Sequence, residues 1–266
     1  MIDLSQFDPN SVGNPNNNVF GLPFTEEDAR LVILPVPWEV TVSYNAGTAR
    51  APEHVFKASL QVDLFDRDAV DVWKHTPFGF YKAIAEKHGD IGILQIDAHC
   101  DLRVAYENFK YSHASVMYNA LEEIPQLKKL VQVGIRDYCE EEWNYITKSE
   151  NRVVTYFDKE IKERQFEGQT WKTIADEIVN HLPQQVFISF DIDGLDPKLC
   201  PHTGTPVQGG FETEQVFYLF KKVLESGRKI VGFDLNEIGV SQDEWDENVG
   251  ARCLFKLCNL LTISNA

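Results

Sequence analysis

Two segments of the chain place acidic and imidazole side chains at alternate positions directly after an apolar run. In "ILQIDAHCDLR", residues 93–103, the apolar run is followed by Asp97, His99 and Asp101. Alternate positions of an extended chain point the same way, so we expect these side chains to converge on one place. In "ISFDIDGLDP", residues 188–197, Asp191 and Asp193 have the same spacing.

A third apolar run, "IVGFDLNEIG", is followed by Glu237. A single acidic residue after a strand is most often a turn former or a helix cap, but alternating pairs after apolar strands are harder to explain in this way. Carboxylates that are held close together repel one another and resist ionising together, so they need a counter-charge. Arg103 is the only arginine close to the first motif. One or two divalent cations would supply this counter-charge better than one arginine.

The types of these side chains indicate which cation would suit them. Carboxylate oxygens with an imidazole suit Mn²⁺, with Fe, Co and Zn as competitors, and the absence of a thiolate ligand lowers the case for structural zinc. Two ions about 3.5–4 Å apart could share bridging carboxylates. A water between two such ions would lose a proton near neutral pH and become a nucleophile, which predicts hydrolysis of an electrophilic carbon or phosphorus centre.

The elements around these motifs predict an α/β fold. Several strands are continuous apolar runs ("IGILQI", "VFISF", "IVGFDL"), as is typical of a parallel sheet covered by helices on both faces. Ligands of such sheets bind beyond the carboxyl ends of the strands, where the acidic motifs fall. We predict strands at Ala29–Pro35, Ile91–Ile96, Lys129–Val133, Arg152–Tyr156, Gln185–Phe190 and Lys229–Leu235, and helices at Pro77–His88, Ala114–Ile124, Glu140–Ser149, Gln169–His181, Thr213–Gly227 and Asn248–Leu261.

Length and charge limit the class of protein. The 266 residues fit one α/β domain over 1–266, with residues 1–28 expected to form a loose N-terminal arm. The net charge of −16 disfavours nucleic-acid partners and suits a cationic substrate. We expect no membrane span and no signal peptide. The five scattered cysteines indicate reduced thiols in the cytoplasm.

The motifs together resemble those of the ureohydrolase family, which includes arginase, agmatinase, guanidino-acid hydrolases and formimidoylglutamase. The pair "DAHCD" and "SFDIDGLDP", in this order, is the most specific part of the resemblance. "TVSYNAGTARAPEHV", "SHAS", "HTGTPVQGGF" and "GFDLNEIG" agree with it, although Ala51 replaces the usual glycine before Pro52. The resemblance runs from about Leu31 to the C-terminal helix.

The resemblance implies a three-layer α/β/α fold, a mainly parallel sheet and a site for two manganese ions. Asp97, Asp101 and Asp191 would ligate one ion together with a further histidine. Asp97, His99, Asp191 and Asp193 would ligate the other, with Asp97 and Asp191 bridging the two. Metal-bound hydroxide would attack the amidino carbon of a small cationic guanidino or formimidoyl substrate. Members of the family are commonly oligomers, so a homo-oligomer is expected.

Two further roles follow from the same resemblance. His113 in "SHAS" would shuttle a proton or position the substrate, and Glu237 would hold the amidino group by paired hydrogen bonds. Arg103 follows the first motif where the family reads the far end of its substrate, so it would suit a substrate carboxylate. An ordinary salt bridge is an equally good interpretation of Arg103.

One family motif is missing in its usual form. A Gly-Gly-Asp-His segment should precede "DAHCD", and its histidine is the remaining ligand of the first ion. Here "VDLFD" runs quickly into "HTPFGFYKAI", as though a block with a sheet strand had been removed. His75 is therefore either the surviving ligand or an ordinary surface residue, in which case only one ion would bind tightly.

These observations leave three functions open. The first is a manganese-dependent hydrolase that releases urea from a guanidino compound such as agmatine or arginine. The second is a formimidoylglutamate hydrolase, which only Arg103 supports. The third is a non-catalytic family member with an incomplete metal site.

Overall fold

The computed structural model describes residues 4, 7–9, 13–25, 28–39, 41, 45–70, 72, 78–79 and 89–266 of the chain. His75 lies outside these residues, so its predicted role as a metal ligand stays a prediction. Within the described part of the chain, no helix combines the length and the apolar composition that crossing a membrane requires.

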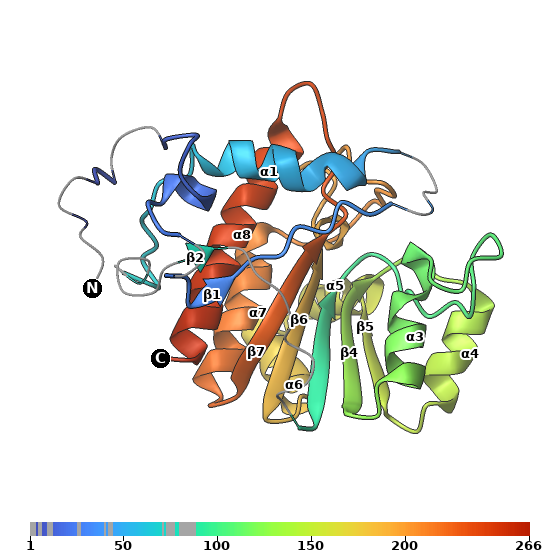
Figure 1. Ribbon diagram of the computed structural model, residues 1–266. Coiled ribbons are helices and arrows are strands. Elements are labelled where there is room, and N and C mark those ends of the chain that lie inside the picture. The colour runs from blue at the N-terminus through green and yellow to red at the C-terminus, as the bar shows by residue number, and fades with distance from the viewer. Residues whose placement is uncertain are drawn as a thin grey trace.

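The centre of the molecule is a five-stranded parallel sheet with the strand order β5-β4-β3-β6-β7 (Figure 1). The strands are β3 (Ile91–Ile96), β4 (Leu127–Ile135), β5 (Val153–Phe157), β6 (Gln185–Asp191) and β7 (Lys229–Asn236). Of the six strands predicted from the sequence, these five are confirmed to within a few residues. Because all five strands run the same way, their carboxyl ends meet at one edge, at the top of Figure 1.

Helices cover both faces of this sheet, which confirms the three-layer α/β/α fold. The helices are α1 (Ala51–Ser59), α3 (Val116–Glu123), α4 (Glu140–Lys148), α5 (Asp158–Phe166), α6 (Trp171–Asn180), α7 (Thr213–Glu225) and α8 (Trp245–Ser264). Neighbouring residues of a strand point to opposite faces. Ile93 of β3 accordingly belongs to the core cluster beneath α3 and α4, whereas Leu94 belongs to the cluster with α5, α6 and α7. The buried positions of the strands are mostly apolar because helices cover both faces of the sheet.

Two elements in the N-terminal half of the chain differ from the sequence prediction. The strand expected over Ala29–Pro35 is only β1 (Leu31–Val32), and it pairs with β2 (Phe78–Gly79) instead of joining the main sheet. The helix expected over Pro77–His88 is wrong at residues 78–79, which form β2, and its remaining residues lie outside the described part. Among the described residues, β7 pairs with β6 alone and is an edge strand of the main sheet. The expectation that a strand is missing stays a prediction.

The expectation of a loose arm over residues 1–28 is wrong for its described C-terminal part. Val19, Phe20, Leu22 and Phe24 are all buried in the main core. The ring of Phe20 lies 5.1 Å from that of Phe255 in α8, edge to face. Asparagine-rich composition suggested a loose arm, but these four apolar residues anchor the segment.

Candidate metal centre

The sheet order brings the two acidic motifs together. β3 and β6 are neighbours, with Ile96 paired to Phe190, so the residues that follow each strand emerge side by side. Two groups of metal-ligand atoms form there, and the atoms of each lie within 4.8 Å of one another. One group is Asp97, His99 and Asp193, and the other is Asp97, Asp101 and Asp191. Asp97 belongs to both.

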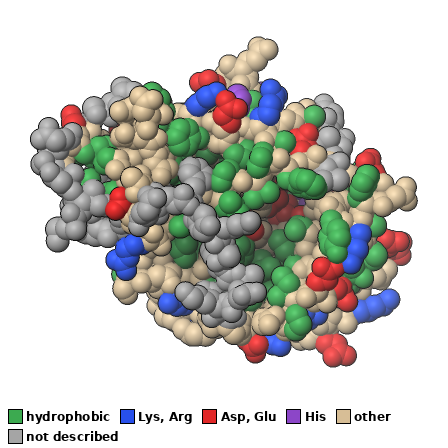
Figure 2. Space-filling model, viewed as in Figure 1, with side chains coloured by type: hydrophobic (Ala, Val, Ile, Leu, Met, Phe, Trp, Pro, Cys, Tyr) green, Lys and Arg blue, Asp and Glu red, His purple; other side chains and the backbone are tan. Residues whose placement is uncertain are grey.

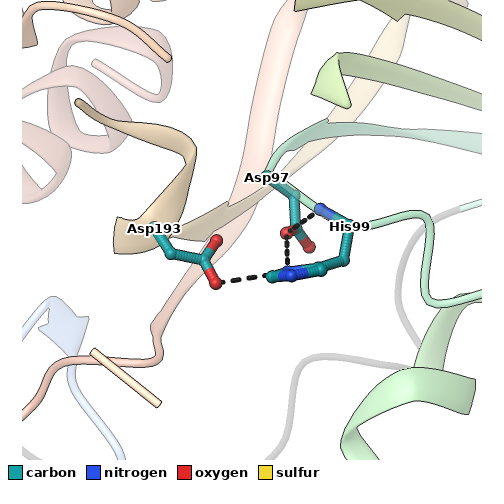
Figure 3. A group of neighbouring side chains, drawn as sticks. All are labelled: Asp97, His99 and Asp193. Carbon is teal, nitrogen blue, oxygen red and sulfur yellow. Dashed lines mark hydrogen bonds and ion pairs between the residues drawn. The ribbon is translucent and has the colours of Figure 1, made fainter. Parts of the chain in front are cut away.

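Figure 3 shows how the first group converges from two elements. Asp97 and His99 follow β3, and Asp193 comes from η4 (Ile192–Gly194), the turn after β6. His99 Nδ1 lies 3.4 Å from Asp97 Oδ1 and 3.3 Å from Asp193 Oδ2. Both carboxylates are buried, with side chains only 1% exposed. Buried carboxylates of this kind need charge partners, and one imidazole supplies only part of that charge.

The second group departs from the extended geometry that the spacing predicted. Asp101 has a φ of 54°, in the left-handed region that residues other than glycine rarely adopt. Its carbonyl accepts hydrogen bonds from the backbone N–H groups of Met117 and Tyr118 at the start of α3, at 3.1 and 3.2 Å. Asp101 therefore reaches the cluster through a left-handed turn anchored to α3. Glu237 shares this feature, with a φ of 61°, and backbone strain of this kind is concentrated at functional sites.

The electrostatics of the centre show an excess of negative charge. Burial, and then the neighbouring carboxylates, raise the pKa values of Asp101 and Asp191 well above their usual range. The same causes raise the pKa of Asp97 to about 6 and that of Glu237 to about 8. Burial also acts to raise the pKa of Asp193, but hydrogen bonding to His99 brings it below its ordinary value.

This donor set fits divalent cations. Four aspartates and one imidazole form two overlapping groups of donors, and only one of the four aspartates has a lowered pKa. Binding a cation would remove the repulsion that raises the other three pKa values. Oxygen donors with an imidazole suit Mn²⁺ and related ions. Figure 2 shows acidic side chains at the bottom of a hollow on this face, with hydrophobic side chains around it.

Glu237 lies beside the two groups, directly after β7, which ends at Asn236. The loop that contains "HTGTPVQGGF" packs against it, and a Cβ added at Gly204 would lie 2.9 Å from Glu237 Oε2. Asn45 fixes this loop, because its backbone N–H donates to Gly204 and its side-chain amide donates to Thr203. The absence of a side chain at Gly204 leaves the position of the Glu237 carboxylate undisturbed.

His113 and Arg103 occupy different settings. His113 Nδ1 lies 2.5 Å from Thr41 Oγ1, and burial, followed by the charge of His99, lowers the pKa of His113. Arg103 Nε lies 3.9 Å from Glu142 Oε2, and its guanidinium stands 5.3 Å from the centre of the Tyr106 ring. Glu142 also accepts the backbone N–H groups of Leu102 and Cys139. The salt bridge of Arg103 is therefore made to a carboxylate that the backbone holds in place.

The structure adds residues that the sequence prediction did not include. Arg136 follows β4 and donates to three carbonyls of the loop after β6, those of Asp193 at 2.5 Å, Leu195 at 3.1 Å and Val207 at 3.1 Å. It thereby holds the turn that carries Asp193. Asn236 donates to Asp191 Oδ1 at 3.1 Å, and Gln95 donates to Asp97 Oδ2 at 2.7 Å. The sequence feature that could have indicated these residues is a polar side chain inside an apolar strand or just after its end.

Comparisons with known proteins agree with these motifs. The chain is 29% identical to N(1)-aminopropylagmatine ureohydrolase of Thermus thermophilus, over 88% of this chain and 91% of the relative. It is 23% identical to an agmatinase of Bacillus cereus, over 86% of this chain and 90% of the relative. The structure resembles that of proclavaminate amidino hydrolase from Streptomyces clavuligerus, with a TM-score of 0.76, 18% identity and coverage of 96% of each chain.

The alignment with the Thermus protein also bears on the missing segment. It extends over 280 positions but covers 88% of 266 residues, about 234, so at least about 46 positions of the relative have no counterpart in this chain. The names of the relatives are those of ureohydrolases, which confirms the enzyme class expected from the sequence. A family model described as "Arginase family" matches residues 74–259, well over half of the sequence. The chain belongs to the arginase family.

Proposed function

We propose that this protein is a metal-dependent hydrolase that cleaves an amidino C–N bond of a guanidino compound and releases urea. The observation that carries the proposal is the meeting of two donor groups, which share Asp97, with Glu237 at the same edge of the sheet. A cationic amidino group needs a carboxylate to hold it, and its carbon needs an activated water beside it. This edge of the sheet offers residues for both tasks.

Two Mn²⁺ ions are the proposed cofactor. Asp97, Asp101 and Asp191 would hold one ion, with His75 as a further candidate ligand. Asp97, His99 and Asp193 would hold the other, with Asp191 as the second shared carboxylate. When bound, such ions lower the pKa of a coordinated water so that it can act as a nucleophile near neutral pH.

Glu237 and His113 are the proposed residues for substrate and proton handling. A guanidinium offers two parallel N–H groups, which a carboxylate accepts as a charge-assisted pair. Binding that cation would also favour the ionised form of Glu237, whose pKa burial raises to about 8. The lowered pKa of His113 keeps its imidazole neutral at pH 7, so that it can accept a proton beside the reacting carbon.

The substrate we favour carries a second cation at its far end, as agmatine and N(1)-aminopropylagmatine do. Asp137 has a 68% exposed side chain, and its Oδ2 lies 4.0 Å from His99 Nε2, so it places a carboxylate at the open side of the centre. The net charge of −16 also favours cations. The contact of Arg103 Nε with Glu142 Oε2 at 3.9 Å favours the salt-bridge interpretation of Arg103 over a role in binding formimidoylglutamate.

The second candidate is a non-catalytic family member with an incomplete metal site. The observation that favours it is the total of about 46 positions of the Thermus ureohydrolase that have no counterpart in this chain. Such a protein would bind one ion or none tightly. A homo-oligomeric state and a cytoplasmic location stay predictions in either case.

Urea release tests the proposal. The purified protein, loaded with Mn²⁺, is assayed with agmatine, N(1)-aminopropylagmatine, arginine and 4-guanidinobutyrate, and formimidoylglutamate is tested for formamide release. We expect turnover with the two amine-tailed compounds and its loss in Asp193→Asn. No turnover of any compound by a folded, metal-loaded protein would favour the non-catalytic candidate.

A further inference from the structure

A row of polar side chains crosses the whole sheet just below the metal centre. Thr155, Gln132, Gln95, Ser189 and Asp234 are paired in register from β5 through β4, β3 and β6 to β7. Each strand contributes one member at the same level, in a sheet whose other buried positions are mostly apolar. Since Asp97 and Asp191 lie two residues after Gln95 and Ser189, they stand on the same face as the row.

One half of this row is a directed chain of hydrogen bonds that ends at Asp97. Thr155 Oγ1 donates to Gln132 Oε1 at 2.9 Å, and Gln132 Nε2 donates to Gln95 Oε1 at 2.8 Å. Gln95 Nε2 then donates to Asp97 Oδ2 at 2.7 Å. Both glutamines are completely buried. Their amides would be costly to bury without partners, and each oxygen and nitrogen here has one.

A backbone carbonyl sets the direction of this chain. Gln132 Nε2 also donates to the carbonyl of Cys100 at 2.7 Å, and a carbonyl only accepts. The nitrogen of Gln132 must therefore face Cys100 and Gln95, so the oxygen of Gln95 must face Gln132. The Gln95 nitrogen is then directed at Asp97, the residue that both donor groups share. Cys100 itself stands between His99 and Asp101, so the same amide also holds the backbone of the metal motif.

The other half of the row supports Asp191 in a similar manner. Ser189 Oγ donates to Asp234 Oδ1 at 2.8 Å, and Asn236 Nδ2 donates to the same oxygen at 2.7 Å. Asn236 Nδ2 also donates to Asp191 Oδ1 at 3.1 Å. Each of the two aspartates that we propose as bridging ligands thus receives one N–H from a side-chain amide that another side chain holds in place.

We propose that Gln95, Gln132 and Thr155 form a positioning relay, which fixes the carboxylate of Asp97 in the orientation that binds metal. With Oδ2 held by Gln95 and Oδ1 by the backbone N–H of His99 at 2.7 Å, the carboxylate cannot rotate. Partners outside the ligand shell commonly change metal affinity 10- to 100-fold. The relay rests on the proposed metal site, and its three members lie outside the two donor groups.

Mn²⁺ titration of metal-stripped variants by calorimetry tests the relay, with thermal denaturation measured in parallel. Gln95→Met keeps the size of the side chain but removes the donor to Asp97, and we expect Mn²⁺ to bind 10- to 100-fold more weakly. Gln132→Met should weaken binding at least threefold, although Gln132 touches no proposed ligand side chain. Thr155→Val should show a smaller loss in the same direction, and Thr155→Ser, which keeps the hydroxyl, should restore the wild-type affinity.

A matched control separates positioning from mere stability. Asn259 in α8 is a buried amide that donates to Asp66 Oδ2 at 3.2 Å, away from the metal centre. Asn259→Met should lower the denaturation temperature and leave Mn²⁺ affinity unchanged. If Gln95→Met and Gln132→Met both bind Mn²⁺ as tightly as the wild type, the relay is wrong but the metal site stands. If Gln95→Met does not fold, wild-type affinity of Gln132→Met is enough to overturn the relay. Failure of the wild-type chain to bind Mn²⁺ would overturn the metal site as well.

Discussion

The substitution Glu237→Gln is expected to stabilise the metal-free protein while it removes activity. Glu237 stands beside buried carboxylates, and burial with their repulsion raises its pKa from 4.5 to about 8. A carboxyl whose pKa is higher in the folded than in the unfolded state contributes its full stability at pH values below the unfolded-state pKa. That contribution is lost as the pH rises through the folded-state pKa. A glutamine side chain is neutral at every pH. The stability of the variant relative to the wild type should therefore grow between about pH 4.5 and pH 8.

The magnitude follows from the size of the shift. A shift of one pKa unit corresponds to about 1.4 kcal/mol, so full ionisation of Glu237 in the metal-free centre would cost roughly 5 kcal/mol. At pH 7.5 ionisation is incomplete, and the side chain is partly exposed to solvent, which screens the repulsion. We therefore expect a gain of about 2–3 kcal/mol, or about 5–10 °C in denaturation temperature for a chain of this size.

Thermal denaturation in excess EDTA, at several pH values from 5 to 8, measures this difference. Glu167→Gln is the matched control, because Glu167 is an exposed glutamate at the end of α5, and it should change stability little at any pH. The Glu237→Gln variant should release no urea once Mn²⁺ is restored, because the neutral amide cannot form a charged pair with a guanidinium. A metal-free Glu237→Gln protein whose stability follows that of the wild type at every pH would refute the reasoning, because Glu237 would then not be ionising against the other carboxylates.

Four other substitutions probe separate parts of the centre. Because Asp97 belongs to both donor groups, Asp97→Asn should abolish tight Mn²⁺ binding, whereas Asp101→Asn should leave one site in a calorimetric titration; equal losses would contradict two groups that share Asp97. Gly204→Ala places a Cβ 2.9 Å from Glu237 Oε2, so the KM for the guanidino substrate should rise at least tenfold with little change in denaturation temperature. Arg136→Lys keeps the charge but shortens the side chain and removes the planar fork, whose Nη1 donates to Gly134 and whose Nη2 donates to Asp193, Leu195 and Val207. The free energy of unfolding should therefore fall by about 1–2 kcal/mol, and Mn²⁺ should bind more weakly.

The sequence predicted most of the sheet because its strands are buried on both faces. β3 has the bounds expected for "IGILQI", and five of its six residues are buried. By contrast, α5 was not predicted, because its sequence "DKEIKERQF" holds only one buried apolar side chain, Ile161, and shows no apolar stripe. The strand expected at Ala29–Pro35 is short because its partner is β2, which no local pattern indicates.

The side chains that gather at the candidate metal centre were predictable from the sequence, but the residues that support them were not. Alternating acids after apolar strands indicated Asp97 and Asp191, and the parallel order of β3 and β6 brings them together. The left-handed turn at Asp101 depends on contacts with α3, and the ion pair of Arg103 depends on Glu142 in α4, neither of which spacing reveals. Gln95 was visible as a polar residue in an apolar strand, but only the register with Gln132 gives it a role.

The central claim is that acids from β3 and β6 meet around shared divalent cations. Diffraction from crystals grown in excess Mn²⁺, recorded at a wavelength where manganese scatters anomalously, tests this claim most directly. We predict two anomalous peaks, both within direct bonding distance of Asp97, with Asp101 beside one peak and His99 and Asp193 beside the other. A centre without such peaks, in which these side chains are turned apart or paired with protein cations, would contradict the claim.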